Sequence, residues 1–228
     1  MRPTVILATC LFWVTPAHAL DWTPSERTDD GIMISAREFA DRDVPAIRGE
    51  IDLNAPATEV AAMILDPARG PDWIDSLKET RQIRVLGPDE FVQYDHMRMP
   101  PLVKDRDFVN RVTVTRDAVN GTITILYRSV VDAEAPETSY VRGETLYASY
   151  VLRTVAGTGE QKTAITAEFR VDPKGDLPRW VVNKFQKNWP VKTLRNLRRE
   201  VLRRIFNQNP EPGVAPFALN SIIAPPTK

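Results

Sequence analysis

Residues 77–172 alternate between apolar and polar side chains, and turn-forming residues interrupt the alternation at intervals. This pattern indicates β-strands with one buried face, because successive strand residues point to opposite sides of a sheet. The predicted strands lie near residues 79–86, 90–99, 106–117, 121–131, 143–155 and 162–172. Asn120 followed by Gly121 is a strong hairpin signal, since both residues tolerate positive φ. The strands are therefore expected to be successive antiparallel neighbours.

Segments with helical spacing lie on either side of this region. Residues 54–66 are predicted as a helix with Pro56 in its first turn, where the missing N–H is not needed. Residues 181–206 carry an apolar stripe and are predicted as one long C-terminal helix, with a kink or break near Asn188-Trp189 because Pro190 lies inside it. Short strands are expected before the first helix, at residues 31–38 and 44–53.

This order of elements indicates an α+β fold in which a curved antiparallel sheet wraps around a long C-terminal helix. A single helix covers the middle of a strongly curved sheet but does not fill the space that the sheet encloses. An internal hydrophobic cavity is therefore expected between the sheet and this helix.

The first residues have the features of an export signal. Arg2 supplies a positive start, residues 5–14 are apolar, and Ala17 to Ala19 form an A-x-A cleavage site. The apolar run is shorter than the ~20 residues that span a bilayer. Residues 1–19 are predicted to be a cleaved signal peptide, which places the protein in the periplasm or outside the cell. A lipoprotein signal ending at Cys10 is the weaker alternative.

The rest of the chain is predicted to form one domain with loose ends. We expect a flexible lead-in over residues 20–30, a folded domain over residues 31–206, and a flexible proline-rich tail over residues 207–228. The domain is expected to be a monomer.

Composition excludes several kinds of chemistry. The 228 residues contain 30 basic and 30 acidic side chains, so the chain has no net positive charge that would attract nucleic acid. Nucleic acid is therefore not expected as a partner. Cys10 is the only cysteine, which excludes disulfides and cysteine-based sites once the signal is removed. His96 would then be the only histidine, and no HExxH, GxSxG or glycine-rich phosphate loop is present. No catalytic residue, metal or cofactor is predicted.

Three short motifs resemble a known family. Pro101 precedes Arg106-Asp107-Phe108 at the start of a strand, residues 172–183 (DPKGDLPRWVVN) lead into the last helix, and Asp72-Trp73 follows the first helix. In their order across residues 30–206 they resemble the START domain, a lipid-transfer family within the helix-grip, or Bet v 1-like, class. The chain is identified as a bacterial-type, exported member.

The resemblance implies a function for the expected cavity. Such a protein binds a lipid or similar hydrophobic ligand between the sheet and the last helix, and carries or transfers it outside the cytoplasm. Two alternatives stay open: an enzyme on the same fold, cyclase-like or hydrolase-like, and an interaction module with a collapsed cavity.

The cavity residues depend on which strand face points inward. In strand 90–99 the face with Tyr94, His96 and Arg98 offers polar groups for a lipid head group, whereas the alternative points Met97 and Met99 inward. For the tyrosines, ordinary core packing is the alternative to ligand contact. The candidate ligand-binding residues are Tyr94, His96, Arg98, Arg106, Tyr127, Tyr147, Tyr150, Phe169, Val181, Phe185 and Trp189.

Arg106 and Asp107 are expected to have separate roles. Adjacent strand residues point to opposite faces, so the two cannot share one partner. One is predicted to face the cavity or its mouth, while the other ties down a neighbouring loop.

The C-terminal helix is strongly basic. Nine basic residues and one acid, Glu200, lie between Arg179 and Arg204. Each basic residue near an anionic membrane adds ~1 kcal/mol of attraction, which suggests transient docking through this helix and its movement as a gate. The alternative is an ordinary solvated helix face. The candidate docking residues are Lys184, Lys187, Lys192, Arg195, Arg198 and Arg199.

Overall fold

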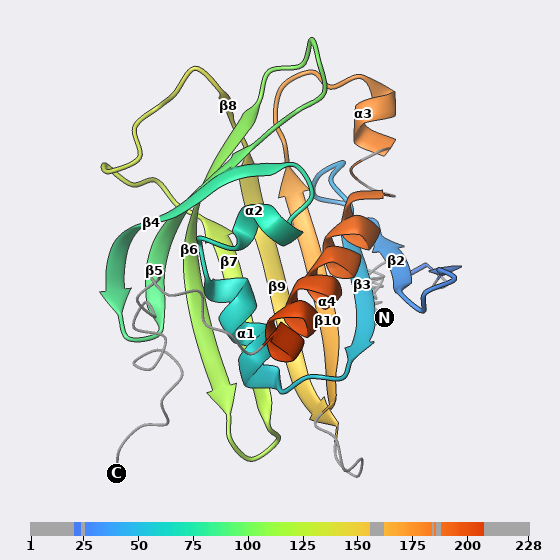
Figure 1. Ribbon diagram of the computed structural model, residues 1–228. Helices are drawn as coiled ribbons and strands as arrows, with labels where there is room; N and C mark the ends of the chain where they lie inside the picture. Colours follow the sequence, from blue (N-terminus) through green and yellow to red (C-terminus); the bar gives the residue numbers. More distant parts are fainter. Residues whose placement is uncertain (1–20, 24–25, 156–161, 184, 186–187, 208–228) are drawn as a thin grey trace, which may run out of the picture.

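The computed structural model describes residues 21–23, 26–155, 162–183, 185 and 188–207. Its centre is a 10-stranded sheet with the order β1-β2-β3-β10-β9-β7-β6-β5-β4, and β8 pairs with β6 (Figure 1). The strands are β1 (Glu26–Arg27), β2 (Met33–Arg37), β3 (Ala46–Leu53), β4 (Leu77–Gly87), β5 (Glu90–Met97), β6 (Arg106–Asp117), β7 (Thr122–Ser129), β8 (Val141–Arg142), β9 (Glu144–Val155) and β10 (Lys162–Asp172).

The antiparallel arrangement follows from the turns. Gly121 has a φ of 59° in the turn between β6 and β7, as the Asn-Gly signal predicts. All the pairs of the main path are antiparallel, and β10 pairs with both β9 and β3. The early strands β2 and β3 therefore lie beside the last strand, and the predicted α+β helix-grip fold is confirmed.

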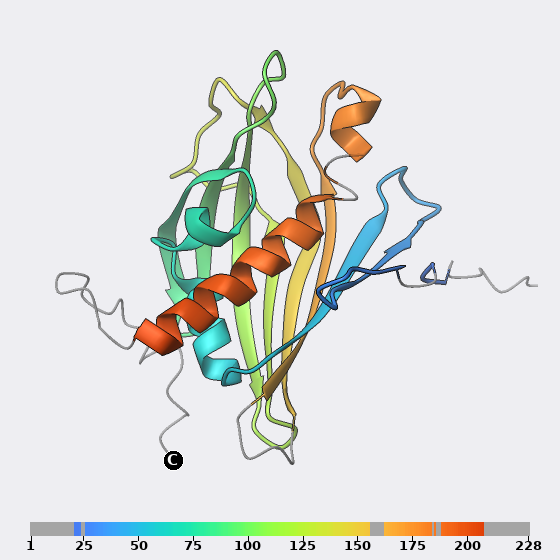
Figure 2. The same ribbon diagram turned by 45° about the vertical axis from the view of Figure 1, so that its right-hand side comes forward.

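Most of the described helices lie at the concave side of the sheet, and one lies beyond the end of β10, as Figures 1 and 2 show. They are α1 (Ala57–Leu65), α2 (Gly70–Trp73), α3 (Arg179–Asn183) and α4 (Trp189–Asn207). The first helix agrees with the prediction, whereas the single helical turn of α2 was not predicted. The predicted long C-terminal helix is divided: α4 begins at Trp189, and Pro190 lies in its first turn, where its missing N–H breaks no bond.

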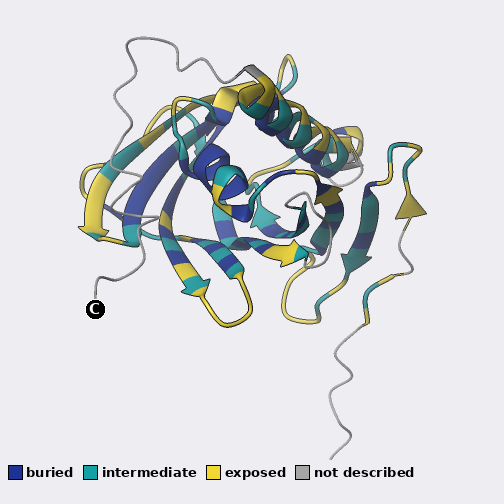
Figure 3. Cartoon of the chain, turned by 60° about the horizontal axis from the view of Figure 1, so that its bottom comes forward, coloured by how far each residue is buried: buried dark blue, intermediate teal, exposed yellow. Residues whose placement is uncertain are grey.

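Helix α4 crosses the concave face of the sheet, as Figure 2 shows. Its inward residues Leu194, Leu197 and Val201 are at most 1% exposed. Gly49 of β3 allows this close packing, because Cδ1 of Leu194 occupies the place that a Cβ at position 49 would need. Figure 3 shows buried residues along the middle of the strands and exposed residues at the hairpin turns.

The structure describes part of the N-terminal segment before the predicted domain but, beyond Asn207, not the segment after it. The signal peptide over residues 1–19 and the tail from residue 208 onward lie outside the described residues. The expected loose lead-in contains β1, which pairs with β2, and Asp30, which contacts α4. No helix in the described part of the chain is long and apolar enough to cross a membrane.

Candidate functional site

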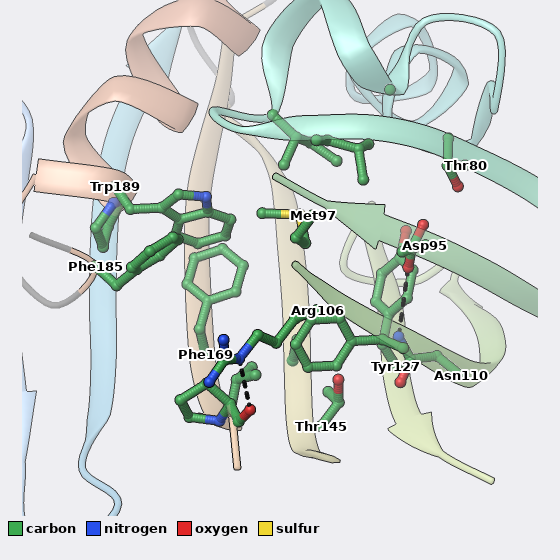
Figure 4. A pocket seen from close by; sticks show the side chains of 18 of the residues that line it. Thr80, Asp95, Met97, Arg106, Asn110, Tyr127, Thr145, Phe169, Phe185 and Trp189 are labelled. Atoms are coloured by element: carbon green, nitrogen blue, oxygen red, sulfur yellow. Dashed lines mark hydrogen bonds between the residues drawn. The ribbon is translucent and has the colours of Figure 1, made fainter. Parts of the chain in front are cut away.

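A cavity of about 250 Å³ lies between the sheet, α1, α2 and the segment that joins β10 to α4. Most of its lining is apolar, and polar groups are confined to a few positions. In Figure 4, Phe169, Phe185 and Trp189 gather on one side, while Asp95 and Asn110 lie on the other. A mainly apolar cavity with few polar groups is typical of a small-molecule binding site.

Aromatic rings form a continuous wall of this cavity. The ring centroids of Trp73 and Tyr150 are 6.0 Å apart, those of Tyr150 and Phe169 5.5 Å, and those of Phe169 and Trp189 5.0 Å, all edge to face. Trp189 Nε1 donates a hydrogen bond to the backbone oxygen of Asp75 at 2.7 Å, which attaches the start of α4 to the segment after α2. Edge-to-face contacts restrain the orientation of each ring, so the four rings hold one another in place along this wall.

The tyrosine hydroxyls on this wall remain protonated. Burial raises the pKa of both Tyr127 and Tyr150 above the ordinary tyrosine range. Both residues line the cavity, as predicted. They therefore offer the cavity neutral hydroxyl groups.

The structure decides between the two faces of strand β5 that the sequence left open. Gln93, Asp95 and Met97 line the cavity, together with Met99 just after the strand. Tyr94, His96 and Arg98 are not among the lining residues, so they cannot form the proposed head-group site. The alternative that pointed the two methionines inward is correct.

The outer face of β5 is buried as well, which explains the error. Tyr94 packs with Val92, Val109 and Ala135, and Ala135 belongs to the loop between β7 and β8. His96 stacks on Tyr140 of the same loop with a centroid distance of 4.1 Å. Because a loop covers the outer side of the sheet here, the side chains on both faces of β5 are either apolar or hydrogen-bonded. Alternation of side chains therefore does not show which face of β5 points to the cavity.

His96 has a structural partner. Its Nε2 lies 2.8 Å from Asp105 Oδ2, and Asp105 Oδ1 accepts a hydrogen bond from the backbone N–H of Met99 at 2.8 Å. His96 thus holds the loop between β5 and β6, while Arg98 is exposed on that loop.

Arg106 lies at the cavity wall. Its Nε donates to the backbone oxygen of Pro173 at 3.1 Å, Nη2 donates to that of Lys174 at 2.9 Å, and Nη1 donates to that of Lys104. Burial lowers the pKa of this guanidinium below its ordinary value. Arg106 therefore fastens the start of β6 to the segment that leads into α3.

Asp107 points to the opposite face, as predicted. Its carboxylate accepts hydrogen bonds from Arg142 Nε at 2.8 Å and from Thr138 Oγ1 at 2.8 Å. Burial opposes ionisation, but these bonds hold the pKa of Asp107 below its usual value. Arg106 and Asp107 thus each fasten a neighbouring segment, one on each side of the sheet.

The remaining cavity candidates divide into two groups. Phe169, Phe185 and Trp189 line the cavity. Val181 is fully buried but does not line it, and the neighbouring Val182 does. Tyr147 also lies outside the lining.

Regular alternation along β9 explains the position of Tyr147, and a bulge beside it brings Thr145 into the cavity lining. The pairing of β9 with β10 shifts between Arg170 and Val171, so that Thr145 and Ala148 both line the cavity. Tyr147 points outward, near Glu168 and Arg170. Because no bulge lies between Tyr147 and Tyr150, these two residues point to opposite faces of the strand, and Tyr150 is the one that lines the cavity.

Sequence reasoning missed the main polar residues of the cavity. Asp95 Oδ1 accepts a hydrogen bond from Gln93 Nε2 at 2.8 Å, and Asp95 Oδ2 accepts one from Asn110 Nδ2 at 3.4 Å. Burial raises the pKa of Asp95, against the opposing effect of the hydrogen bonds from Gln93 and Asn110. The one signal was the choice of face on β5, which alternation left open. In the described residues, no three His, Cys, Asp or Glu side chains gather as a metal site.

The basic residues of α4 are largely paired with acids. The carboxylate of Asp30 lies 2.8 Å from Arg195 Nε and 2.6 Å from Arg198 Nη2. Arg198 Nη1 also donates a hydrogen bond to the backbone oxygen of Asp30 at 2.9 Å. Glu200 pairs with Arg199 and Arg203. These pairs leave less free charge on the helix than its sequence suggests.

The other docking candidates are Lys192, Lys184 and Lys187. Lys192 is exposed on α4. Lys184 and Lys187 lie outside the described residues.

Hydrogen bonds from Arg195 and Thr28 hold the pKa of Asp30 far below its ordinary value, so the contact between Asp30 and α4 is ionic at neutral pH. We refer to Asp30 with Arg195 and Arg198 as the Asp30 clamp.

A sheet curved around a C-terminal helix, with an apolar cavity between them, defines a protein of the helix-grip class. The family model described as START domain matches residues 8–205. The chain therefore belongs to the START domain family, whose members bind and transfer lipids.

Individual relatives are distant in sequence. The chain is 26% identical over 204 residues to an uncharacterized protein of Pseudomonas aeruginosa, which covers 90% of this chain and 98% of that protein. It is also 26% identical over 186 residues to the mitochondrial steroidogenic acute regulatory protein of Gallus gallus. That match covers 80% of this chain but only 65% of the Gallus protein.

Solved structures agree with this assignment of the fold. Human STARD10 superposes with a TM-score of 0.74 at 22% identity, covering 88% of this chain and 81% of that chain. A STAR-related lipid transfer protein fragment from Xanthomonas axonopodis superposes with a TM-score of 0.67 at 23% identity, covering 79% and 98%. At these identities the likeness supports the fold alone.

Proposed function

We propose that this protein binds a single lipid or similar apolar molecule in its cavity and carries it, as a monomer, outside the cytoplasm. The observation that carries the proposal is the apolar cavity of about 250 Å³. Ligand pockets commonly measure ~300–1,000 Å³, so this cavity suits a compact ligand or expands on binding. Burial of an acyl chain contributes ~0.8 kcal/mol per CH₂ group, which is sufficient to hold a lipid in exchange with a membrane.

A cavity-filling substitution tests the binding. Ala148 lines the cavity from β9, and Ser149 is its neighbour on the opposite face of the strand. Native mass spectrometry and lipid extraction of the purified wild-type protein are expected to find one bound apolar molecule. Ala148→Phe is expected to lose it, while Ser149→Phe retains it. Absence of any ligand, together with no thermal stabilisation by a lipid panel, contradicts the proposal.

We place membrane docking at the end of the molecule where α3 and the β5–β6 loop lie together, as Figures 1 and 2 show. Leu102 of the loop is fully exposed and Trp180 of α3 is 55% exposed. Arg98 and Lys104 are exposed cations on the same loop. Apolar tips beside cations suit an anionic membrane surface, and the Arg106 hydrogen bonds join these two segments at the cavity.

Vesicle co-sedimentation distinguishes this surface from α4. Replacing Leu102 and Trp180 by Ser is expected to weaken binding to vesicles that contain phosphatidylglycerol. Val119 is 93% exposed in the turn between β6 and β7, at the opposite end, so Val119→Ser is the matched control. A loss caused by Lys192→Gln, with no effect of the Leu102 and Trp180 changes, would assign docking to α4 instead.

Export is proposed from the N-terminal signal alone. The intact mass of protein recovered from the producing cells is expected to match a chain that begins at Leu20. A mass that includes residues 1–19 in a cytoplasmic fraction contradicts export.

A further inference from the structure

One aromatic ring of the cavity packs against the backbone of the sheet. Phe108 of β6 lines the cavity, and Gly143, which precedes β9, lies against one edge of its ring. A Cβ on Gly143 would overlap Cε1 of Phe108, so only a glycine leaves room for the ring at this position. Gly143 is buried and does not line the cavity. The ring of Phe108 therefore separates the cavity from the chain at Gly143.

The pairing of the strands explains why a ring fills this place. The pairing of β7 with β6 ends where Ser129 lies opposite Asn110. Beyond that point β6 pairs with β8, and the N–H of Gly143 donates a hydrogen bond to the backbone oxygen of Asp107 at 2.9 Å. The neighbour of Phe108 is thus the turn from β8 into β9. Because this turn is hydrogen-bonded to β6, its backbone blocks the ring from moving farther out of the cavity.

Phe108 is not part of the aromatic wall described above. In the described structure its ring makes no edge-to-face or stacked contact with another ring. It is half-buried, whereas its strand neighbours Asp107 and Val109 are each 1% exposed. Since Phe108 lines the cavity, the accessible part of its ring faces the space for the ligand.

The size of the cavity gives this ring a function. The cavity measures about 250 Å³, whereas pockets for drug-sized ligands commonly measure ~300–1,000 Å³. Because protein interiors are closely packed, the cavity grows only if a side chain moves away. Phe108 cannot move back, since the backbone at Gly143 lies behind it. Figure 4 shows Tyr127 and Thr145 on the side of the cavity away from Trp189, and Phe108 closes the cavity against the sheet between β6 and β9.

A lipid with two acyl chains is larger than a drug-sized ligand, and the cavity is smaller than the usual pocket for one. We propose that Phe108, packed on Gly143, sets the size limit of the cavity, so that the protein takes an apolar ligand with a single chain and excludes lipids with two chains. This inference rests on the proposed function, because it concerns the ligand of the same cavity. It assigns to Phe108 the choice of ligand size, independently of the polar end of the ligand.

Two glycerides with different numbers of chains test the size limit. Monolauroylglycerol and dilauroylglycerol are both uncharged, and their binding to the purified protein is measured by displacement of a fluorescent probe. Monolauroylglycerol is expected to bind at least about tenfold more tightly, a usual degree of size discrimination in an apolar pocket. A cavity that held both chains would give the opposite order, because each further buried CH₂ group favours binding. Equal or tighter binding of dilauroylglycerol overturns the inference.

Two substitutions are expected to move the limit in opposite directions. Phe108→Ala removes the ring and is expected to reduce the preference for monolauroylglycerol by about tenfold or more. Gly143→Ala pushes the ring into the cavity and is expected to weaken the binding of monolauroylglycerol itself by about tenfold. The double variant is expected to bind like Phe108→Ala alone, because the new methyl group then has no ring to displace. A double variant as weak as Gly143→Ala contradicts this coupling and overturns the inference.

Phe91→Ala is the matched control for the loss of a ring. Phe91 of β5 is 4% exposed in the core and does not line the cavity. This variant is expected to melt at a lower temperature and to keep the wild-type preference between the glycerides. If Phe108→Ala does not fold, Phe108→Leu is measured and is expected to show a smaller change in the same direction. An unchanged preference in a folded Phe108 variant overturns the inference.

The outcomes also distinguish this inference from the proposed function. If both glycerides bind alike and Ala148→Phe blocks them, the cavity binds apolar molecules and only the size limit is wrong. If neither glyceride binds to the wild-type protein, the inference fails. The lipid panel and native mass spectrometry then decide whether the proposed function fails with it.

Discussion

Arg106 and Asp107 are consecutive residues of β6 whose side chains fasten different segments on opposite faces of the sheet. Arg106 donates to the backbone oxygens of Pro173 and Lys174 beside the cavity. Asp107 accepts hydrogen bonds from Thr138 and Arg142 on the outer side. One dipeptide therefore positions both the segment before α3 and the loop that covers β5.

The two anchors predict separate effects in hydrogen exchange. Arg106→Met is expected to destabilise the fold by ~1–3 kcal/mol, because the carbonyl oxygens of Pro173 and Lys174 lose their charged donor, and to speed exchange over residues 173–178. Asp107→Asn is expected to speed exchange over residues 137–142 instead. Each variant is the control for the other, and overlapping footprints would show that the anchors do not act separately.

The Asp30 clamp predicts that the N-terminal turn holds α4. Asp30→Asn is expected to lower stability at neutral pH by ~0.2–1 kcal/mol per lost pair, a range that reflects solvent screening. Asp29→Asn, an exposed neighbour, is the control. Faster exchange in α4 of the Asp30 variant alone would confirm the clamp, and equal exchange in both variants would exclude it.

The clamp also sets a direction for acid sensitivity. The pKa of Asp30 lies below the ordinary 3.8 in the folded state, first because of the hydrogen bond from Arg195. Its contribution is therefore complete above pH 3.8 and is lost as the pH falls toward the folded-state pKa. Unfolding curves of the wild type and Asp30→Asn are expected to differ at neutral pH and to converge in strong acid.

Asp95 predicts the opposite dependence. Burial raises its pKa above 3.8, so the folded protein binds this proton more tightly than the unfolded chain does. Stability from this group is present below pH 3.8 and is lost as the pH rises through the folded-state pKa. Asp95→Asn is therefore expected to stabilise the protein at neutral pH but not in acid. A stability difference that shrinks with rising pH would contradict the assignment.

The close approach of β3 and α4 predicts a steric coupling. Gly49→Ala is expected to destabilise the protein by ~1–3 kcal/mol, because Cδ1 of Leu194 occupies the space of the new methyl group. Gly87→Ala is the control, since nothing lies within 4 Å of the place that its methyl group would take. In the Gly49→Ala, Leu194→Ala double variant, the loss in unfolding free energy should be smaller than the sum of the two separate losses. Additive losses would argue against this contact.

Local patterns were sufficient to predict most elements of the fold. The expected strand at 106–117 agrees with β6, and the expected strand at 162–172 agrees with β10. The cavity candidates on β7 and β10 were also correct, since Tyr127 and Phe169 line the cavity. These strands have one clearly more apolar face, so alternation decides their orientation.

Contacts between distant segments could not be predicted in this way. The break before α4 was expected from Pro190, but the contact of the Trp189 indole with the backbone oxygen of Asp75, far away in sequence, was not. The basic stripe of α4 was visible, but its pairing with Asp30 requires the N-terminal turn to lie against the helix. The bulge in β9 that brings Thr145 to the cavity arises from its pairing with β10.

The sequence by itself determined the class of fold, the order of its elements and which side chains share a strand face, because these follow from local periodicity. Only the tertiary structure decided which face of β5 meets the cavity. The loop between β7 and β8 covers the outer face, so Tyr94 and His96 are buried there as fully as residues on the inner side. Alternation separates the two faces of a strand, but it shows which face is the inner one only when the other face is exposed to water. Here both faces are buried, and Asp95 rather than His96 faces the cavity.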